Sequence, residues 1–278
     1  MNNVLTPTEH VIPESNIVVF SPHYDDFLLT VGGYLLELKS LGILDTKNIH
    51  VLILFSRSNY LAGTGDENFD KSLDRQKLST GKRLLEDTEC INEIMGPYNY
   101  RYELAGELEC FLREGKTYAE SEMEFPHGMF DDFYGEDWEV FERMKDRIRK
   151  WAQREDTALV FPTALKEHID HFIVREAAVQ VYTDTAGKLN ASFYFHEDKP
   201  YGGIANSEEL GRLDAFVQTN DLKRKVYYYD PEKVIELAFK HYVSQVEEVY
   251  KKGIKNRAVM LQNLYCGERP CDQLFFPV

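Results

Sequence analysis

The sequence has little positive charge and no long apolar run. Its 32 Lys and Arg are outnumbered by 47 Asp and Glu, so the net charge is −15 at pH 7. This balance argues against a nucleic-acid backbone or an anionic membrane surface as the main partner. No apolar run approaches the roughly 20 residues that a membrane-spanning helix needs, and the opening "MNNVLTPTEHVIPES" carries no signal-peptide pattern. We therefore expect a cytoplasmic protein without a membrane span, whose partner is a neutral small molecule or a metal ion.

Nucleotide-binding glycine patterns are missing, and cysteine is scarce. No Gly-x-Gly-x-x-Gly follows the first predicted strand, and "GTGD" at 63–66 lacks the Lys and Ser/Thr that complete a P-loop, which excludes the common nucleotide-binding motifs. Of the four cysteines, Cys266 and Cys271 have the spacing of half a zinc site or of a disulfide. A lone C-x4-C pair is weak evidence for either, and we expect reduced thiols.

Apolar runs without polar alternation are separated by segments of helical spacing. Such runs predict strands buried on both faces, here at residues 16–20, 50–56 and 157–163, with a later strand within 189–203. Helical periodicity covers residues 26–42, 73–96, 138–155, 171–185 and 230–253. Alternating strands and helices imply right-handed crossovers and a parallel sheet covered on both sides. We expect one α/β domain over residues 1–278, with a C-terminal helical extension.

Two adjacent glycines, Gly32 and Gly33, lie inside the first predicted helix. Each costs ~1 kcal/mol relative to alanine in a helix interior. We expect them to allow close packing of this helix on the sheet.

Polar residues collect where the predicted strands end. The first strand is followed by His23, Asp25 and Asp26, the second by Ser56 and Arg57, and the third by His168, Asp170 and His171. In an open parallel sheet, ligands bind outside the carboxyl ends of the strands. Two histidines and a carboxylate form a suitable three-ligand set for a catalytic divalent metal with an open position for water. Such ligands suit Zn²⁺, and less exclusively Fe²⁺, Co²⁺ or Mn²⁺.

Each of these clusters also has an ordinary structural interpretation. Asp25 and Asp26 precede a helix, where aspartates commonly cap the N-terminus and favour the helix dipole. If they are functional, neighbouring side chains should diverge, one towards a metal and the other towards the substrate. His168 and His171 could be a pair of surface histidines. Because both clusters fall at carboxyl ends of strands, their conjunction favours a site.

The rim of such a site has weaker candidates. Arg57 is expected either to hold a sugar hydroxyl or phosphate or to form a surface salt bridge. His196 and Tyr201 flank an acidic loop and could line the pocket. The aromatic segment 125–138 is expected either to cover the cleft or to pack at the periphery.

Two short motifs resemble those of a known family. "PHYDD" followed by "LLTVGGYL" is similar to the "HPDDE…GGTL" opening of the PIG-L/LmbE-like deacetylases, and "HIDH" resembles their H-x-D-H motif. Three weaker matches keep the same order: "RLLEDTECINEIMG", "FHEDKPYGG" and "KHYVSQV". The resemblance extends over residues 16–246, nearly the whole chain.

The resemblance implies a Rossmann-like α/β/α fold and hydrolysis of an N-acetyl group, usually from an N-acetylglucosamine unit. At matching positions it implies His23, Asp26 and His171 as ligands of one divalent metal, most commonly zinc. The soluble substrate expected from the chain's acidity and lack of a membrane segment is an N-acetylglucosamine conjugate.

The same resemblance assigns catalytic roles. It implies Asp25 as the general base and His168 as the residue that stabilises the oxyanion or protonates the leaving amine. Asp170 would orient a histidine from outside the ligand shell. Arg57, His196 and Tyr201 are the candidates for substrate contacts.

Two residues depart from the family pattern. Tyr24 stands where the family usually has proline, and Phe27 stands where it usually has glutamate. The ligands and the base are all retained, so we predict an active metal-dependent deacetylase. The alternative is a catalytically degenerate carbohydrate-binding or scaffold relative, for which Phe27 is the only indication.

Overall fold

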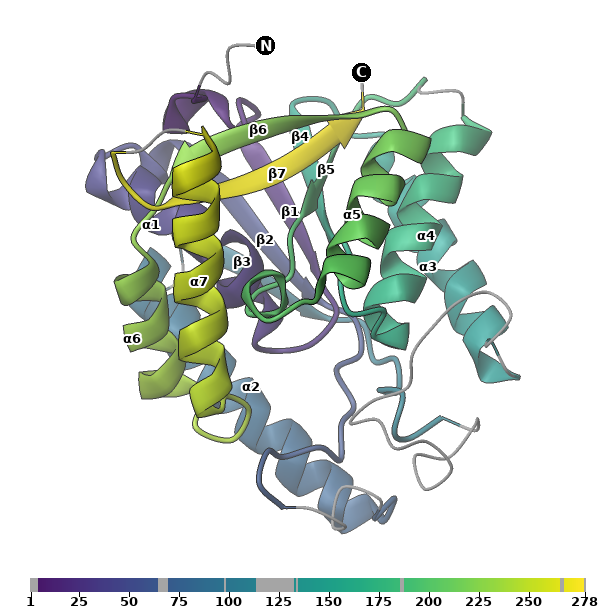
Figure 1. The fold of residues 1–278 in the computed structure, drawn as a ribbon. Helices are drawn as coiled ribbons and strands as arrows, with labels where there is room; N and C mark the ends of the chain where they lie inside the picture. Colours follow the sequence, from purple (N-terminus) through teal and green to yellow (C-terminus); the bar gives the residue numbers. More distant parts are fainter. Residues whose placement is uncertain are drawn as a thin grey trace.

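A seven-stranded sheet forms the middle layer of the protein in a computed structural model (Figure 1), which describes residues 5–64, 70–97, 99–113, 133, 135–185, 188–265 and 268–277. In chain order the strands are β1 (Asn16–Ser21), β2 (Asn48–Ile53), β3 (Tyr100–Leu104), β4 (Thr157–Pro162), β5 (Ser192–His196), β6 (Leu222–Tyr228) and β7 (Cys271–Pro277). The helices are α1 (Gly33–Ser40), α2 (Leu73–Met95), α3 (Glu136–Ala152), α4 (Ile169–Asp184), α5 (Ser207–Thr219), α6 (Pro231–His241) and α7 (Glu248–Tyr265).

The strand order across the sheet is β3-β2-β1-β4-β5-β7-β6. The first five of these strands pair in parallel, whereas β7 runs antiparallel to both β5 and β6. Strands β2 and β3 therefore extend the sheet on one side of β1, and β4 and the later strands extend it on the other side. The reversal between β1 and β4 is the place where open α/β sheets form their ligand crevice.

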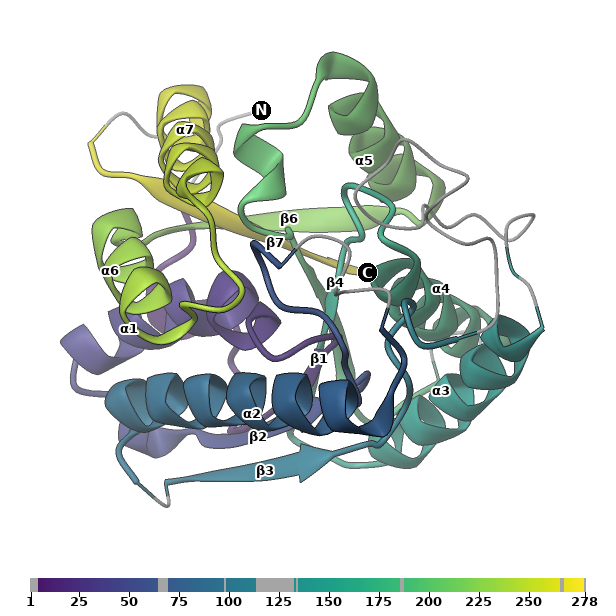
Figure 2. The same ribbon diagram turned by 90° about the horizontal axis from the view of Figure 1, so that it is seen from below.

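Successive residues of the central strands face opposite layers. Ile17 and Val19 of β1 belong to one hydrophobic core, and Val18 and Phe20 to the other. Helices α1, α2, α6 and α7 cover the first face, and α3, α4 and α5 cover the second (Figures 1 and 2). This arrangement confirms the predicted three-layer, Rossmann-like α/β/α fold with a mainly parallel sheet.

The structure corrects the sequence-based elements at the C-terminal end. Residues 230–253 do not form one helix, because α6 ends at His241 and α7 begins at Glu248. The buried Tyr242 hydroxyl donates to Asp87 Oδ1 at 2.7 Å, and the Ser244 hydroxyl donates to Glu86 Oε2 at 2.6 Å. These contacts with α2 hold the connection out of helical conformation.

Only helix was predicted at the C-terminal end, and strands β6 and β7 were missed. Strand β7 inserts between β5 and β6, so the end of the chain is part of the sheet. Strand β3 was not predicted either, and none of its residues is fully buried. The assignment of residues 1–278 to one domain stays a prediction.

The cysteines and the helices bear on two further expectations. Cys90 and Cys110 are buried and form no disulfide, and the buried Cys271 thiol donates to the Arg269 carbonyl at 3.3 Å. Cys266 lies outside the described residues. Among the helices of the described chain, none has the length and apolar content needed to cross a bilayer.

Close packing at the paired glycines is confirmed at Gly33. A Cβ atom added there would lie 2.6 Å from Cδ2 of Tyr229, the residue just after β6. Tyr229 is buried, so its ring has no open space into which to move. The glycine therefore lets the start of α1 lie directly against this ring.

Gly33→Ala should destabilise the protein by about 1–3 kcal/mol, because the added methyl group overpacks a buried contact. The matched control is Gly81→Ala in α2, where no atom lies within 4 Å of the added Cβ; it should be neutral or stabilising by up to about 1 kcal/mol. Urea unfolding of both variants measures the difference. Equal stabilisation by the two substitutions would show that the Tyr229 contact is not tight.

Candidate metal centre

Two loops meet at the carboxyl edge of the sheet. One follows β1 and carries His23, Asp25 and Asp26, and the other follows β4 and leads into α4 through His168. Because β1 and β4 are parallel neighbours, their carboxyl ends lie side by side. Residues 145 positions apart in the chain are thus brought together at the strand-order reversal.

Three side chains converge on one point. His23 Nδ1 lies 3.2 Å from Asp26 Oδ2, His171 Nε2 lies 3.1 Å from the same oxygen, and the two nitrogens are 3.3 Å apart. A tetrahedral ion with bonds of about 2.0–2.1 Å separates its ligand atoms by about 3.3 Å. The triangle therefore has the dimensions of three ligands around one zinc-sized cation, and all three side chains are buried.

Each of the two histidines contacts a second carboxylate through its other ring nitrogen. His23 Nε2 is 2.9 Å from Asp170 Oδ2, and His171 Nδ1 is 2.6 Å from Asp198 Oδ1. Such outer carboxylates fix the tautomer and the orientation of metal-binding imidazoles. The family resemblance implied that Asp170 orients a histidine, and in the structure Asp170 contacts His23. Asp198 makes the equivalent contact with His171, and it was not identified from the sequence.

The carboxylates make the centre attractive to positive charge. Burial lowers the pKa of His23, but hydrogen bonds with Asp170 and Asp26 outweigh it and raise the pKa to about 9. Burial likewise opposes protonation of His171, yet Asp26 and Asp198 raise its pKa well above the usual value. The pKa of Asp26 is raised by burial but held well below its usual range by His171 and His23. Metal binding here must displace protons from both imidazoles, so affinity should rise with pH.

Asp25 and Asp26 contact different partners. Oδ1 of Asp25 lies 3.5 Å from Nη2 of Arg83, whereas Asp26 faces the histidines. The two aspartates therefore have different partners, as predicted, and the π turn that begins at Leu28 has no side-chain cap. Burial and the neighbouring Asp26 raise the pKa of Asp25, although Arg83 and His23 act in the opposite direction.

His168 is the N-cap of α4. Its Nδ1 accepts a hydrogen bond from the backbone N–H of Asp170 at 3.2 Å, so Nε2 is the nitrogen that carries the proton. Burial and the charge of His23 lower its pKa well below the usual value. The ring centroid lies 4.8 Å from that of His23, and the side chain is buried, so the surface-histidine interpretation is wrong.

Sequence reasoning missed a buried arginine beside the centre. Arg83 of α2 lies 3.1 Å from Glu109 Oε2, and Glu109 Oε1 is in turn 4.0 Å from His23 Nε2. Arg83 Nε also donates to Gln245 Oε1 at 2.7 Å. The signal was present in the weak family matches that begin at Arg83 and contain Gln245.

The three candidates for substrate contacts occupy different environments. Arg57 is exposed and donates to Gln76 Oε1 at 3.3 Å. His196 is only 1% exposed, with Nε2 2.9 Å from the Tyr227 hydroxyl and Nδ1 2.9 Å from the Glu197 carbonyl. Burial, followed by the charges of Asp25 and Asp26, raises the pKa of Tyr201. The substrate role of all three residues stays a prediction.

The aromatic segment 125–138 can be followed only at its end. Residues 125–132 and 134 lie outside the described residues. The Phe133 and Trp138 rings are 5.0 Å apart, centroid to centroid, and Phe133 also contacts the Phe172 ring of α4. Its role as a cover over the cleft stays a prediction.

The two departures from the family pattern are buried. The Tyr24 hydroxyl donates to the Ser56 carbonyl at 2.7 Å, and the Arg83 guanidinium lies 5.6 Å from the centroid of its ring. Phe27 is part of the hydrophobic core beneath α1 and α2. The Phe27 ring therefore serves the core of the protein.

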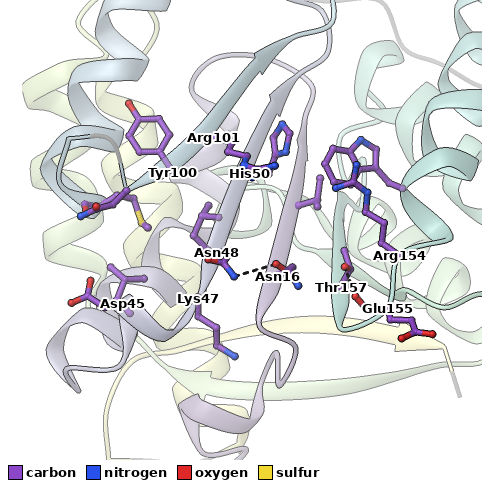
Figure 3. A pocket seen from close by; sticks show the side chains of 16 residues that line it. Asn16, Asp45, Lys47, Asn48, His50, Tyr100, Arg101, Arg154, Glu155 and Thr157 are labelled. Atoms are coloured by element: carbon purple, nitrogen blue, oxygen red, sulfur yellow. Dashed lines mark hydrogen bonds between the residues drawn. The ribbon is translucent and has the colours of Figure 1, made fainter.

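A separate hollow of about 800 Å³ lies at the other end of the sheet. It is lined by the first residues of four strands, Asn16, Asn48, Tyr100 and Thr157 (Figure 3). Asn48 Nδ2 donates to Asn16 Oδ1 at 3.2 Å across its floor. Since the convergent ligands are at the carboxyl ends, this hollow does not serve the metal centre.

His171→Ala should abolish stoichiometric metal binding, because it removes one corner of the ligand triangle. Elemental analysis of protein dialysed against Zn²⁺ measures the metal content. The control is His241→Ala, since His241 is paired with Glu93 on the other side of α2 and its loss should leave the metal in place. Unchanged stoichiometry in His171→Ala would show that the ligand set is wrong.

The comparisons with known proteins bear on the fold. No protein-family model and no curated protein matches the sequence. Among solved structures, the zinc-inhibited form of teicoplanin deacetylase Orf2 matches with a TM-score of 0.61 and 16% identity over 94% of this chain and 97% of that chain. The A40926 pseudoaglycone deacetylase Dbv21 matches with a TM-score of 0.60 and 16% identity over 95% and 97%.

A third match is N,N'-diacetylchitobiose deacetylase from Pyrococcus horikoshii, with a TM-score of 0.52 and 15% identity over 95% of this chain and 84% of that chain. All three likenesses extend over nearly the whole of this chain, as the motif resemblance does. Together they show that the chain has the fold of the PIG-L/LmbE-like deacetylases.

Proposed function

We propose that the protein is a metal-dependent N-deacetylase that removes an acetyl group from an amino-sugar unit. The observation that carries this proposal is the ligand triangle of His23, Asp26 and His171, with Asp25 and His168 beside it. Hydrolysis of an amide demands an activated water, a base and a group that stabilises the oxyanion. The site offers a candidate for each.

His23, Asp26 and His171 would hold one divalent metal, with zinc the best fit and iron, cobalt or manganese as alternatives. When bound, such a metal supplies a Lewis acid that polarises the amide carbonyl and lowers the pKa of a water to about 7. Asp170 and Asp198 keep the two imidazoles turned towards the shared point.

Asp25 is the proposed general base. Its carboxylate lies 3.5 Å from Arg83 Nη2, and this ion pair supports a fixed position for the base. It takes a proton from water as the new C–O bond forms, and this proton passes to the leaving nitrogen as the C–N bond breaks. The products are acetate and a free amine.

His168 is proposed to bind the oxyanion. Since its Nδ1 accepts from the backbone of Asp170, its Nε2 has the proton and is the donor. Of the two roles that the family resemblance allowed, this geometry favours stabilisation of the tetrahedral intermediate. A positioned donor of this kind typically contributes about 10²–10³-fold to the rate.

An N-acetylglucosamine conjugate is the proposed substrate class. The fold is shared with proteins named as deacetylases of teicoplanin, of A40926 pseudoaglycone and of N,N'-diacetylchitobiose. The net charge of −15 disfavours a strongly anionic substrate. Arg57, His196 and Tyr201 stay the proposed substrate contacts. A cytoplasmic location is part of the same proposal.

The alternative of a catalytically degenerate relative depended on Phe27. Since that ring lies in the hydrophobic core, it does not indicate a damaged site. Both Asp25 and His168, which a non-catalytic relative has no need to retain, are buried beside the ligands.

Metal-loaded protein should release acetate and a primary amine from one or more members of a panel of N-acetylglucosamine derivatives. The panel should include the monosaccharide, diacetylchitobiose and N-acetylglucosaminyl glycopeptides, with enzymatic acetate detection and fluorogenic amine labelling as parallel assays. Protein that has bound its metal but is silent across the panel would contradict the proposed substrate class.

Asp25→Asn should lower kcat by about 10²–10⁴-fold, because a positioned base contributes by this factor, and should leave the metal content unchanged. Asp87→Asn is the control: Asp87 is also buried, and it accepts from the Tyr102 hydroxyl at Oδ2 and from the Tyr242 hydroxyl at Oδ1, so the amide keeps one acceptor and offers an N–H donor to the other hydroxyl oxygen. Steady-state kinetics on the best panel substrate measures both. A near-normal kcat in Asp25→Asn would place the base elsewhere.

A further inference from the structure

The helix that follows the loop of His23 and Asp25 starts at Asp26 and contains a π-helical turn, Leu28–Gly32, before α1. A π turn is rare, occurs often at functional sites and shifts backbone carbonyls out of the usual hydrogen-bond pattern. Here the carbonyl oxygens of Leu29 and Thr30 accept hydrogen bonds from Lys199 Nζ at 3.2 and 3.3 Å. An ammonium from the loop after β5 thus holds the turn that follows Asp26.

Thr30 connects the Lys199 ammonium to the proposed ligand Asp26. The Thr30 hydroxyl donates to the Asp26 carbonyl at 2.6 Å, and the Thr30 carbonyl is one of the two that Lys199 holds. The position of the Asp26 backbone is therefore tied to the turn, and the position of the turn is tied to the ammonium.

Lys199 is itself fixed in place. Its Nζ lies 2.6 Å from Oδ2 of Asp272 on β7, and both residues are buried. The same carboxylate oxygen accepts from the Tyr227 hydroxyl at 3.1 Å. The desolvation free energy lost on burying an ion pair often exceeds the Coulombic energy gained between its two charges. The buried Lys199–Asp272 pair is therefore not well explained as a source of folding stability. A role in fixing geometry accounts for it better.

The neighbouring residue braces the other loop. Asp198 Oδ1 contacts His171 Nδ1, while its Oδ2 accepts from the Thr163 hydroxyl at 2.7 Å and from the Leu165 N–H at 3.1 Å. Two consecutive residues after β5 thus contact the surroundings of two ligands that come from separate loops. The distance between these two ligands, Asp26 and His171, sets one side of the ligand triangle.

We propose that Lys199 is a positioning residue of the metal centre, which sets the place of Asp26 through the π turn and Thr30. The inference rests on the proposed metal-dependent function. Loss of the ammonium should let the turn relax and displace Asp26 from the triangle. Outer-shell changes typically weaken metal affinity by about 10–100-fold, and a similar loss is expected here.

The test compares two double variants that each remove one ion pair from the same segment without changing net charge, the first pair buried and the second half-buried. Lys199→Met with Asp272→Asn removes the pair that holds the π turn. Glu197→Gln with Arg257→Met removes a pair, 2.6 Å between Nε and Oε1, that joins the same segment to α7. Competition with a chromophoric chelator gives the Zn²⁺ affinity, the visible spectrum of Co²⁺-loaded protein reports ligand geometry, and melting of metal-free protein reports stability.

The Lys199/Asp272 variant should bind Zn²⁺ about 10–100-fold more weakly and show an altered Co²⁺ spectrum. The Glu197/Arg257 variant should keep the wild-type affinity and spectrum even if its melting temperature falls. Wild-type affinity and spectrum in the Lys199/Asp272 variant would overturn the inference while leaving the proposed function intact. Failure of the wild-type protein to bind a metal would overturn both.

A second pair of variants leaves the buried charges in place. Thr30→Val removes the hydroxyl that links the turn to the Asp26 carbonyl, whereas Thr30→Ser retains it. Thr30→Val should weaken Zn²⁺ binding and alter the Co²⁺ spectrum, and Thr30→Ser should restore both. Equal behaviour of the two variants would overturn the link to Asp26 even if the Lys199/Asp272 variant does not fold.

Discussion

A single carboxylate oxygen, Oδ2 of Asp26, organises this end of the molecule. It accepts the backbone N–H of His23 at 2.8 Å and contacts a ring nitrogen of His23 and of His171 within 3.2 Å. Three buried carboxylates, Asp26, Asp170 and Asp198, thus bond directly to two imidazoles. Two imidazolium charges offset two of these three negative charges, and one divalent cation with neutral imidazoles offsets the same number. The same field that raises the histidine pKa values therefore prepares the site for a metal.

The sheet explains why this convergence is possible. The strand order reverses between β1 and β4, so the two ligand loops start as neighbours and diverge into helices on opposite faces. The loop after β5, the next strand along, supplies Asp198 and Lys199 from the side. Each loop contributes polar groups to the same edge, while alternate residues of the strands fill the two cores. Fold and site depend on the same topology.

The sequence predicts those parts of the protein that are local. Buried strands appear as uninterrupted apolar runs, and the two motifs place His23, Asp26 and His171 at strand ends. Arg83, Asp198 and Lys199 could not be assigned in this way, because their roles depend on contacts between segments far apart in the chain. The break between α6 and α7 was not predicted for the same reason. Tyr242 and Ser244 form hydrogen bonds with α2, and such contacts with a distant segment cannot be read from helical periodicity.

The buried environment also explains how the chain tolerates phenylalanine in place of the family's usual glutamate. Loss of a carboxylate beside the ligands would matter if His23 had no other acidic partner. It has Asp170 at 2.9 Å and Glu109 at 4.0 Å, and Glu109 is in turn held by Arg83. Position 27 is then available for the core, where the ring is fully buried. The acidic partners of His23 come from the loop after β3 and from the first turn of α4, so phenylalanine at position 27 is a change in packing.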